Sequence, residues 1–207
     1  MGDRRPSEAP KRGKVGVMAT VGDVYRNPVT GERAVVIAAE PDRLVVDLFV
    51  RAGGRVAGEH IHPFMTERFA VLGGTVGFRV DGRDDTASAG SDVVEAAAGV
   101  PHDWWNVGAE EAHVRIELLG RQAVLDKFEN SIVLLFGLAH EGKVNAKGMP
   151  NPLQLAIIAT SYADVIRFTS PPAFVQRTLL PLLAALGKAR GYADTYPAHR
   201  TLVVQNA

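Results

Sequence analysis

Two histidines and a glutamate lie close together in the sequence between Gly54 and Gly74. His60 and His62 are separated by one residue, and Glu67 follows five residues after His62. In a β-strand, side chains two positions apart project to the same face, so both imidazoles would point toward one spot. Glu67 begins an alternating apolar segment, and a turn between two strands would bring its carboxylate back over the histidines. Two imidazoles and one carboxylate are a ligand set suited to iron, manganese, nickel, cobalt or zinc.

A fourth candidate ligand, His102, lies downstream in the sequence GVPHDWWN. The first segment matches the spacing Gly-x5-His-x-His-x4-Glu-x6-Gly at every fixed position. In the second, Gly99, His102 and Asn106 match the end of Gly-x5-Pro-x-Gly-x2-His-x3-Asn. These two patterns resemble the conserved motifs of the cupin superfamily. Ser91 and Ala97 stand where the family has glycine and proline, which affects turn geometry and leaves all four ligand positions filled.

The resemblance implies a small jelly-roll barrel that holds one divalent transition metal inside its mouth. The implied ligands are His60, His62, Glu67 and His102, with iron expected first and manganese, nickel, copper or zinc as alternatives. Such a metal keeps one or two positions open, where a water or a substrate oxygen is polarised. Glu67 has two roles open to it: it binds the metal, or it moves off and acts as the catalytic general base.

Four aromatic residues near these ligands are candidates for a substrate pocket. Phe64 lies in the turn between the ligands, and Phe69 shares a strand face with Glu67. Trp104 and Trp105 are adjacent, so on a strand one points into the fold and the other points away. The alternative for each of these residues is ordinary packing in the core.

Of the three histidines outside both motifs, two are predicted from their surroundings in the sequence to have no function. His113 shares a strand face with Arg115 and Glu117, which predicts a solvent-directed position. His199 lies in a segment that contains proline, near the end of the sequence, and is expected at the surface. Neither is predicted to be functional.

Short apolar segments separated by turn residues dominate the chain from residue 21 to residue 120. They cover residues 34–38, 44–50, 69–72, 76–80 and 114–118. This spacing is typical of an antiparallel sandwich or barrel. Asp81 and Gly82 predict a two-residue hairpin turn, because both residue types tolerate a positive φ. We therefore predict a mainly β fold, a cupin-type jelly-roll β-barrel followed by a C-terminal helical segment.

Residues 121–207 carry helical patterns. One helix or a pair of short helices is expected over residues 124–139, and another helix over residues 153–168 after the capping pair Asn151 and Pro152. A third is expected over residues 173–190, where Pro181 should kink or divide it. We predict that this extension packs on the barrel. The alternative is a lid over the mouth whose polar groups line a pocket, namely His140, Glu141, Lys143, Asn145, Lys147, Gln154, Tyr162 and Arg167.

The composition excludes several classes of function. The 207 residues include no cysteine, which excludes a thiol nucleophile and a disulfide scaffold. The 23 basic and 23 acidic side chains balance, which argues against nucleic acid as a partner. No apolar run reaches the roughly 18 residues that a membrane span needs. We expect a flexible basic tail at residues 1–20, no secretion signal, no membrane partner and a cytoplasmic location.

The cupin resemblance predicts the fold and the metal site more firmly than it predicts the reaction, because one fold supports many functions. The first expectation is a metal enzyme similar to quercetin-dioxygenase-like cupins, an oxygenase or dioxygenase acting on a small organic molecule. The second is a non-oxidative isomerase, lyase or cyclase that uses Glu67 or a neighbouring tyrosine as base. The third is a non-catalytic protein that binds a metal or a small molecule. Exposed strand edges in such barrels often pair, so a homodimer is expected.

Overall fold

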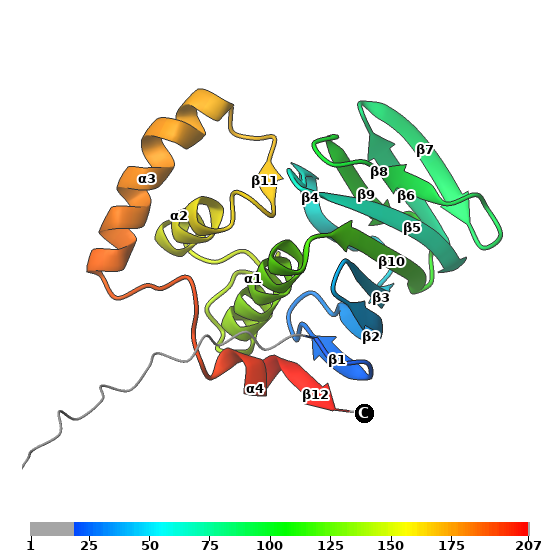
Figure 1. Ribbon diagram of the computed structural model, residues 1–207, viewed down its shortest axis with the longest axis horizontal. Coiled ribbons are helices and arrows are strands. Elements are labelled where there is room, and N and C mark those ends of the chain that lie inside the picture. The colour runs from blue at the N-terminus through cyan, green and yellow to red at the C-terminus, as the bar shows by residue number, and fades with distance from the viewer. Residues whose placement is uncertain (1–18, 207) are drawn as a thin grey trace, which may run out of the picture.

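Residues 19–206, the part of the chain that the computed structural model describes, form two antiparallel β-sheets and a group of helices (Figure 1). The seven-stranded sheet has the order β12-β1-β2-β3-β10-β5-β8. Its strands are β1 (Asp23–Arg26), β2 (Arg33–Glu40), β3 (Arg43–Val50), β5 (Met65–Gly73), β8 (Val94–Ala96), β10 (Ala112–Gly120) and β12 (Val204–Asn206). The five-stranded sheet has the order β11-β4-β9-β6-β7. Its strands are β4 (Arg55–Ile61), β6 (Thr75–Val80), β7 (Arg83–Ser88), β9 (His102–Asn106) and β11 (Arg167–Phe168).

Alternation along the central strands builds the core between the two sheets. On β5, Met65, Glu67, Phe69 and Val71 are buried, and the residues between them are more exposed. β10 shows the same period of two, with Val114 among its fully buried residues. Because one face of each strand is buried, a slip of one residue would expose the whole apolar set. The sequence pattern thus fixes the register that places Glu67 inside.

The hairpin between β6 and β7 turns at the two residues that the sequence indicates. Asp81 has φ of 50° and Gly82 has φ of 73°, and Val80 pairs directly with Arg83 across the turn. Positive φ at both central residues matches the right-handed twist of the strands. The hairpin prediction is therefore confirmed.

The helices all lie in the C-terminal part of the described chain, after β10 (Figure 1). They are α1 (Gln122–His140), α2 (Pro152–Ser161), α3 (Ala173–Ala189) and α4 (His199–Val203). The Asn151 side chain caps α2 by accepting hydrogen bonds from the backbone N–H groups of Leu153 and Gln154. α3 continues through Pro181 as one helix, so the proline does not divide it.

The second helix ends earlier than the sequence predicts. α2 stops at Ser161, and Arg167 and Phe168 form β11, which pairs with the edge of β4. The prediction of a helix over residues 153–168 is therefore wrong at its C-terminal end. Hydrogen bonds offered by an open sheet edge override the local helical pattern there.

His199 is also not where the sequence predicts. It is 1% exposed, beneath α1, rather than at the surface. Gly137 on α1 makes room for the ring, because a Cβ at that position would lie 2.1 Å from His199 Cγ. α4 then leads into β12, which pairs with β1, so the C-terminal residues join the sheet near its first strand (Figure 1).

The fold-class prediction is confirmed. The described chain is mainly β, with two antiparallel sheets consistent with a jelly-roll sandwich and with helices in its C-terminal part. Within residues 19–206, no helix has both the length and the hydropathy that a membrane span requires. The predicted N-terminal tail lies almost entirely outside the described residues.

Candidate metal centre

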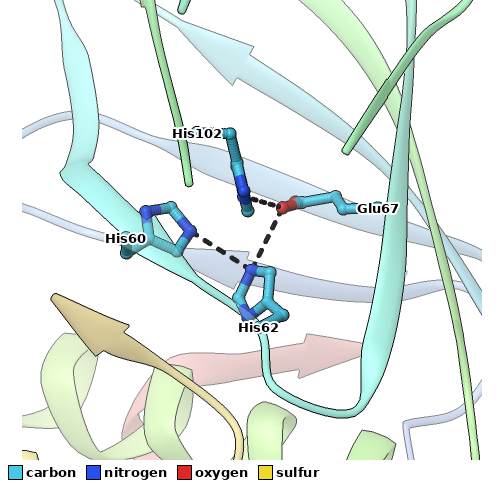
Figure 2. A group of neighbouring side chains, drawn as sticks. All are labelled: His60, His62, Glu67 and His102. Atoms are coloured by element: carbon cyan, nitrogen blue, oxygen red, sulfur yellow. Dashed lines mark hydrogen bonds and ion pairs between the residues drawn. The ribbon is translucent and has the colours of Figure 1, made fainter. Parts of the chain in front are cut away.

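The four candidate ligands come from both sheets and point toward one another (Figure 2). His60 lies on β4, His62 directly follows that strand, Glu67 lies on β5 and His102 begins β9. Their nearest ligand atoms all lie within 4.8 Å of one another. All four side chains are buried, with exposed fractions between 1% and 5%.

Three short contacts connect the group. Nε2 of His60 lies 3.2 Å from Nε2 of His62. Oε2 of Glu67 lies 3.1 Å from Nε2 of His62 and 3.0 Å from Nε2 of His102. The same nitrogen of each ring therefore faces the centre of the group, together with one carboxylate oxygen.

Backbone carbonyl groups fix the orientation of all three rings. His60 Nδ1 donates to the Gly58 carbonyl at 2.7 Å, and His102 Nδ1 donates to the Val100 carbonyl at 2.9 Å. His62 Nδ1 donates to the carbonyl of Val165, a residue from the C-terminal part of the chain, at 2.6 Å. Since a carbonyl oxygen only accepts, each neutral ring carries its proton on Nδ1.

This arrangement fits a divalent transition metal. In their neutral form the three rings present only Nε2 lone pairs to the centre, beside an anionic oxygen. Such lone pairs repel one another unless a cation or added protons lie between them. Imidazole nitrogens with a carboxylate oxygen are an established set for transition metals, and a hydrogen bond from the second ring nitrogen commonly orients such ligands.

An irregularity in β4 positions His60. The register with β9 shifts between Val56 and His60, and inside that interval Ala57 has φ of 64° and Gly58 has φ of 86°. A positive φ is unfavourable for alanine, and such strain is often found at functional sites. Here the irregular backbone presents the Gly58 carbonyl to the His60 ring.

Burial and the neighbouring rings shift the protonation of the group. Burial, followed by the charges of His62 and His102, lowers the pKa of His60 to about 4. Burial alone would raise the pKa of Glu67, but the hydrogen bonds that His102 and His62 donate when Nε2 carries a proton outweigh it and lower the pKa. Burial would lower the pKa of His102, but its hydrogen bond with Glu67 raises it. At neutral pH, His60 is therefore neutral and Glu67 is a carboxylate, the states in which both bind metals.

The four aromatic pocket candidates occupy different environments. Phe69 and Trp104 are 1% and 2% exposed, and the Phe69 ring lies 6.2 Å from the His102 ring. Trp105 points away from this core, with the Arg55 guanidinium 5.0 Å from its ring. Phe64 is 56% exposed in the turn between β4 and β5. Their roles in substrate binding stay predictions.

Two aromatic rings that the sequence did not single out contact the ligands. Phe128 of α1 meets the His62 ring edge-on at 5.4 Å between centroids, and the Phe168 ring of β11 lies 6.3 Å from the His60 ring. Both come from the C-terminal part of the chain. No spacing rule connects them with the histidines, so no local pattern in the sequence could have revealed them.

Four of the polar side chains proposed above for a lid contact residues other than the four candidate ligands. The Tyr162 hydroxyl donates to the Asp194 carbonyl at 2.8 Å, and the Gln154 amide donates to the Ala193 carbonyl at 2.8 Å. Glu141 and Lys143 form an ion pair at 2.9 Å. Tyr162 and Gln154 thus connect α2 to the loop before α4.

The middle of the chain is similar in sequence to a known protein family. Residues 48–118 match the family described as Cupin domain. No protein of curated function matches the chain in sequence. Solved structures with similar folds include three that cover less than half of this chain. The Schizosaccharomyces pombe Cnp3 cupin domain is 14% identical, with a TM-score of 0.41 over 44% of this chain and 66% of that one.

The second is KdgF from Halomonas sp., 17% identical, with a TM-score of 0.43 over 49% of this chain and 90% of that one. The third is TT1209 from Thermus thermophilus, 21% identical, with a TM-score of 0.42 over 46% of this chain and 90% of that one. TM-scores below 0.5 give no basis for transferring a function. The family match and the two-sheet fold support the cupin superfamily for residues 48–118, the segment that carries all four candidate ligands.

Proposed function

We propose that this protein is a metal-dependent cupin enzyme that acts on a small organic molecule, most directly as an oxygenase. One observation carries the proposal: three Nε2 atoms and one carboxylate oxygen converge within 4.8 Å, and a backbone carbonyl orients each ring. Iron(II) is the metal that we propose first. Manganese, nickel, copper and zinc suit the same donors.

The proposed ligands are His60, His62, Glu67 and His102. A bound iron(II) would supply Lewis acidity toward a substrate oxygen and a position for O₂ beside a chelating substrate. The protein holds the rings in one orientation and keeps Glu67 ionised. The burial of all four side chains also keeps bulk water away from the reacting atoms.

Tyrosine contacts narrow the choice of base for the isomerase, lyase or cyclase alternative. That alternative needs a base beside the metal, either Glu67 or a tyrosine. The hydroxyl of Tyr25 bonds to Glu129, and that of Tyr196 bonds to Gln154. The Tyr162 hydroxyl bonds to the Asp194 carbonyl, and burial raises the pKa of Tyr162 to about 12. These three hydroxyls have partners away from the four ligands, so Glu67 is a better candidate for the base than any of these three tyrosines.

Oxygen consumption tests this proposal directly. Protein loaded anaerobically with iron(II) is mixed with air-saturated buffer and a panel of small chelating compounds, such as enols, α-hydroxyketones, β-diketones and flavonols. We expect O₂ uptake that depends on one class of compound. The zinc-loaded protein and the Glu67→Gln variant should show none. Turnover of a compound by the zinc form without O₂ uptake would instead support the non-oxidative alternative.

A further inference from the structure

The four candidate ligands are closed off on the side that faces the interior of the sandwich. Phe69, Phe78 and Trp104 are each 1–2% exposed there. Their rings pack together, with centroids 5.3 Å apart for Phe69 and Phe78 and 5.8 Å apart for Phe69 and Trp104. Protein interiors packed in this way leave no room for a substrate. A molecule that reaches the ligands must therefore approach from another side.

A segment of the C-terminal part covers another side of the ligands. Residues 162–169, here called the strap, connect α2 toward α3, and their strand β11 lies against β4 (Figure 1). Phe168 pairs with His60 in register, and the Thr169 backbone N–H donates to the Glu59 carbonyl at 3.2 Å. The Val165 carbonyl accepts the hydrogen bond from His62 Nδ1. The strap thus contacts two of the four candidate ligands.

The side chains on this face are apolar and aromatic. Phe168 of the strap lies against His60, and Phe128 of α1 lies against His62. Both rings are partly exposed, whereas the rings of Phe69, Phe78 and Trp104 are buried. The charged strap residues are exposed: Asp164 pairs with Lys127 at 2.6 Å, and Arg167 bonds to the Ala163 carbonyl at 3.2 Å. The charged groups of the strap therefore make their contacts at its outer surface.

We infer that Phe128 and Phe168 form the wall that selects the substrate. The inference rests on the proposed metal site and adds a substrate class to it. The ligand has a metal-binding oxygen group at one end and an apolar body, aromatic by preference, at the other. The oxygen group would bind a metal held by the four candidate ligands, and the apolar body would pack against the two phenylalanine rings.

Two hydroxamates that differ only in their apolar body test this inference. Acetohydroxamate and benzohydroxamate present the same chelating group to the cobalt(II)-loaded protein, and the visible absorption of cobalt reports binding without turnover. The affinities of the two probes for free cobalt(II) give the reference ratio. Relative to that ratio, the wild-type protein should favour benzohydroxamate by about tenfold or more, because its phenyl ring is buried. Phe128→Ala and Phe168→Ala should each remove most of that preference.

Phe174→Ala is the matched control, because Phe174 is 71% exposed on α3. It should keep the full preference. Thermal melts of the apo and cobalt forms show whether each variant folds, and Phe128→Leu and Phe168→Leu replace any alanine variant that does not. An equal affinity of the wild-type protein for both probes would overturn the inference, as would an undiminished preference in folded Phe128 and Phe168 variants. Failure to bind cobalt(II) at all would overturn the proposed metal site instead.

Discussion

Glu67 supplies the only formal negative charge among the four candidate ligands, and its Oε2 lies within 3.1 Å of two histidine nitrogens. Glu67→Gln keeps the shape of the side chain and removes the charge. We expect the dissociation constant for a divalent transition metal to rise by about a hundredfold or more, because an amide oxygen attracts the cation far less than a carboxylate does. Competition with a chromophoric chelator measures this change.

Glu95→Gln is the control for that experiment. Glu95 lies on β8, half-exposed, and pairs with Arg68 at 2.6 Å. Its replacement also removes one carboxylate but leaves the four candidate ligands intact, so the metal affinity should stay at the wild-type value. An equal loss in both variants would mean that overall charge, rather than the Glu67 carboxylate, holds the cation.

Asp47 on β3 contributes to the free energy of unfolding by an amount that depends on pH. Oδ1 and Oδ2 accept from Arg115 at 2.7 and 2.9 Å. Burial alone would raise the pKa of Asp47, but the hydrogen bonds from Arg115 outweigh it, so the pKa is lowered. A carboxyl whose pKa is depressed by folding stabilises the protein above its unfolded pKa of about 3.9, and this contribution disappears as the pH falls through the folded pKa.

We therefore expect Asp47→Asn to lower the free energy of unfolding by about 1 kcal/mol at pH 7, because Arg115 is partly exposed and solvent screens the pair. The difference from wild type should shrink at pH 3 and below. Urea denaturation at both pH values measures it, with Asp85→Asn on the exposed strand β7 as control. A difference that grows in acid would contradict the assignment.

At the scale of elements, the contact between α1 and α4 depends on one glycine. A Cβ at Gly137 would lie 2.1 Å from His199 Cγ, so the two helices pack only because position 137 has no side chain. We expect Gly137→Ala to lower the free energy of unfolding by about 2–3 kcal/mol through overpacking. Removing the ring should relieve the clash, so the same substitution in the His199→Ala background should cost much less.

Chemical denaturation of the four proteins in this double-mutant cycle measures the coupling between Gly137 and His199. Additive effects would contradict the packing argument. They would show that the alanine acts through the backbone of α1 and not through the His199 ring.

The elements also show what the sequence can and cannot predict. His60, His62 and Glu67 could be brought together from sequence because a strand and a hairpin relate them locally. The cap of α2 was predictable for the same reason, since Asn151 acts on its own helix. The carbonyl of Val165 was not, because every residue carries one and only the tertiary fold brings this one to His62. β11 was missed because its partner strand lies about a hundred residues earlier.

At the scale of the whole molecule, a buried charged network joins the two ends of the described chain. Tyr25 of β1 donates to Glu129 of α1, and Arg200 of α4 contacts the same carboxylate at 2.7 Å. Arg200 also lies 3.5 Å from Asp23. Burial, followed by the charge and hydrogen bond of Glu129, raises the pKa of Tyr25, so the phenol stays protonated and donates.

We expect Arg200→Ala to lower the free energy of unfolding by about 2–4 kcal/mol, because it leaves the Glu129 charge buried without its cationic partner. Arg177→Ala, exposed on α3, is the matched control and should change stability by less than about 0.5 kcal/mol. Thermal and urea unfolding measure both. Equal stability of the two variants would show that the network does not hold the C-terminal elements against β1.

The central claim is that four side chains together bind one metal ion, and metal content tests it most directly. Plasma mass spectrometry of untagged wild-type protein is compared with His60→Ala and with His140→Ala, a histidine whose Nε2 lies 3.0 Å from the Arg26 carbonyl. We predict about one divalent transition metal ion per chain in the wild type and in His140→Ala, and its loss in His60→Ala. No metal in the wild type after reconstitution, or the same content in His60→Ala, would contradict the account.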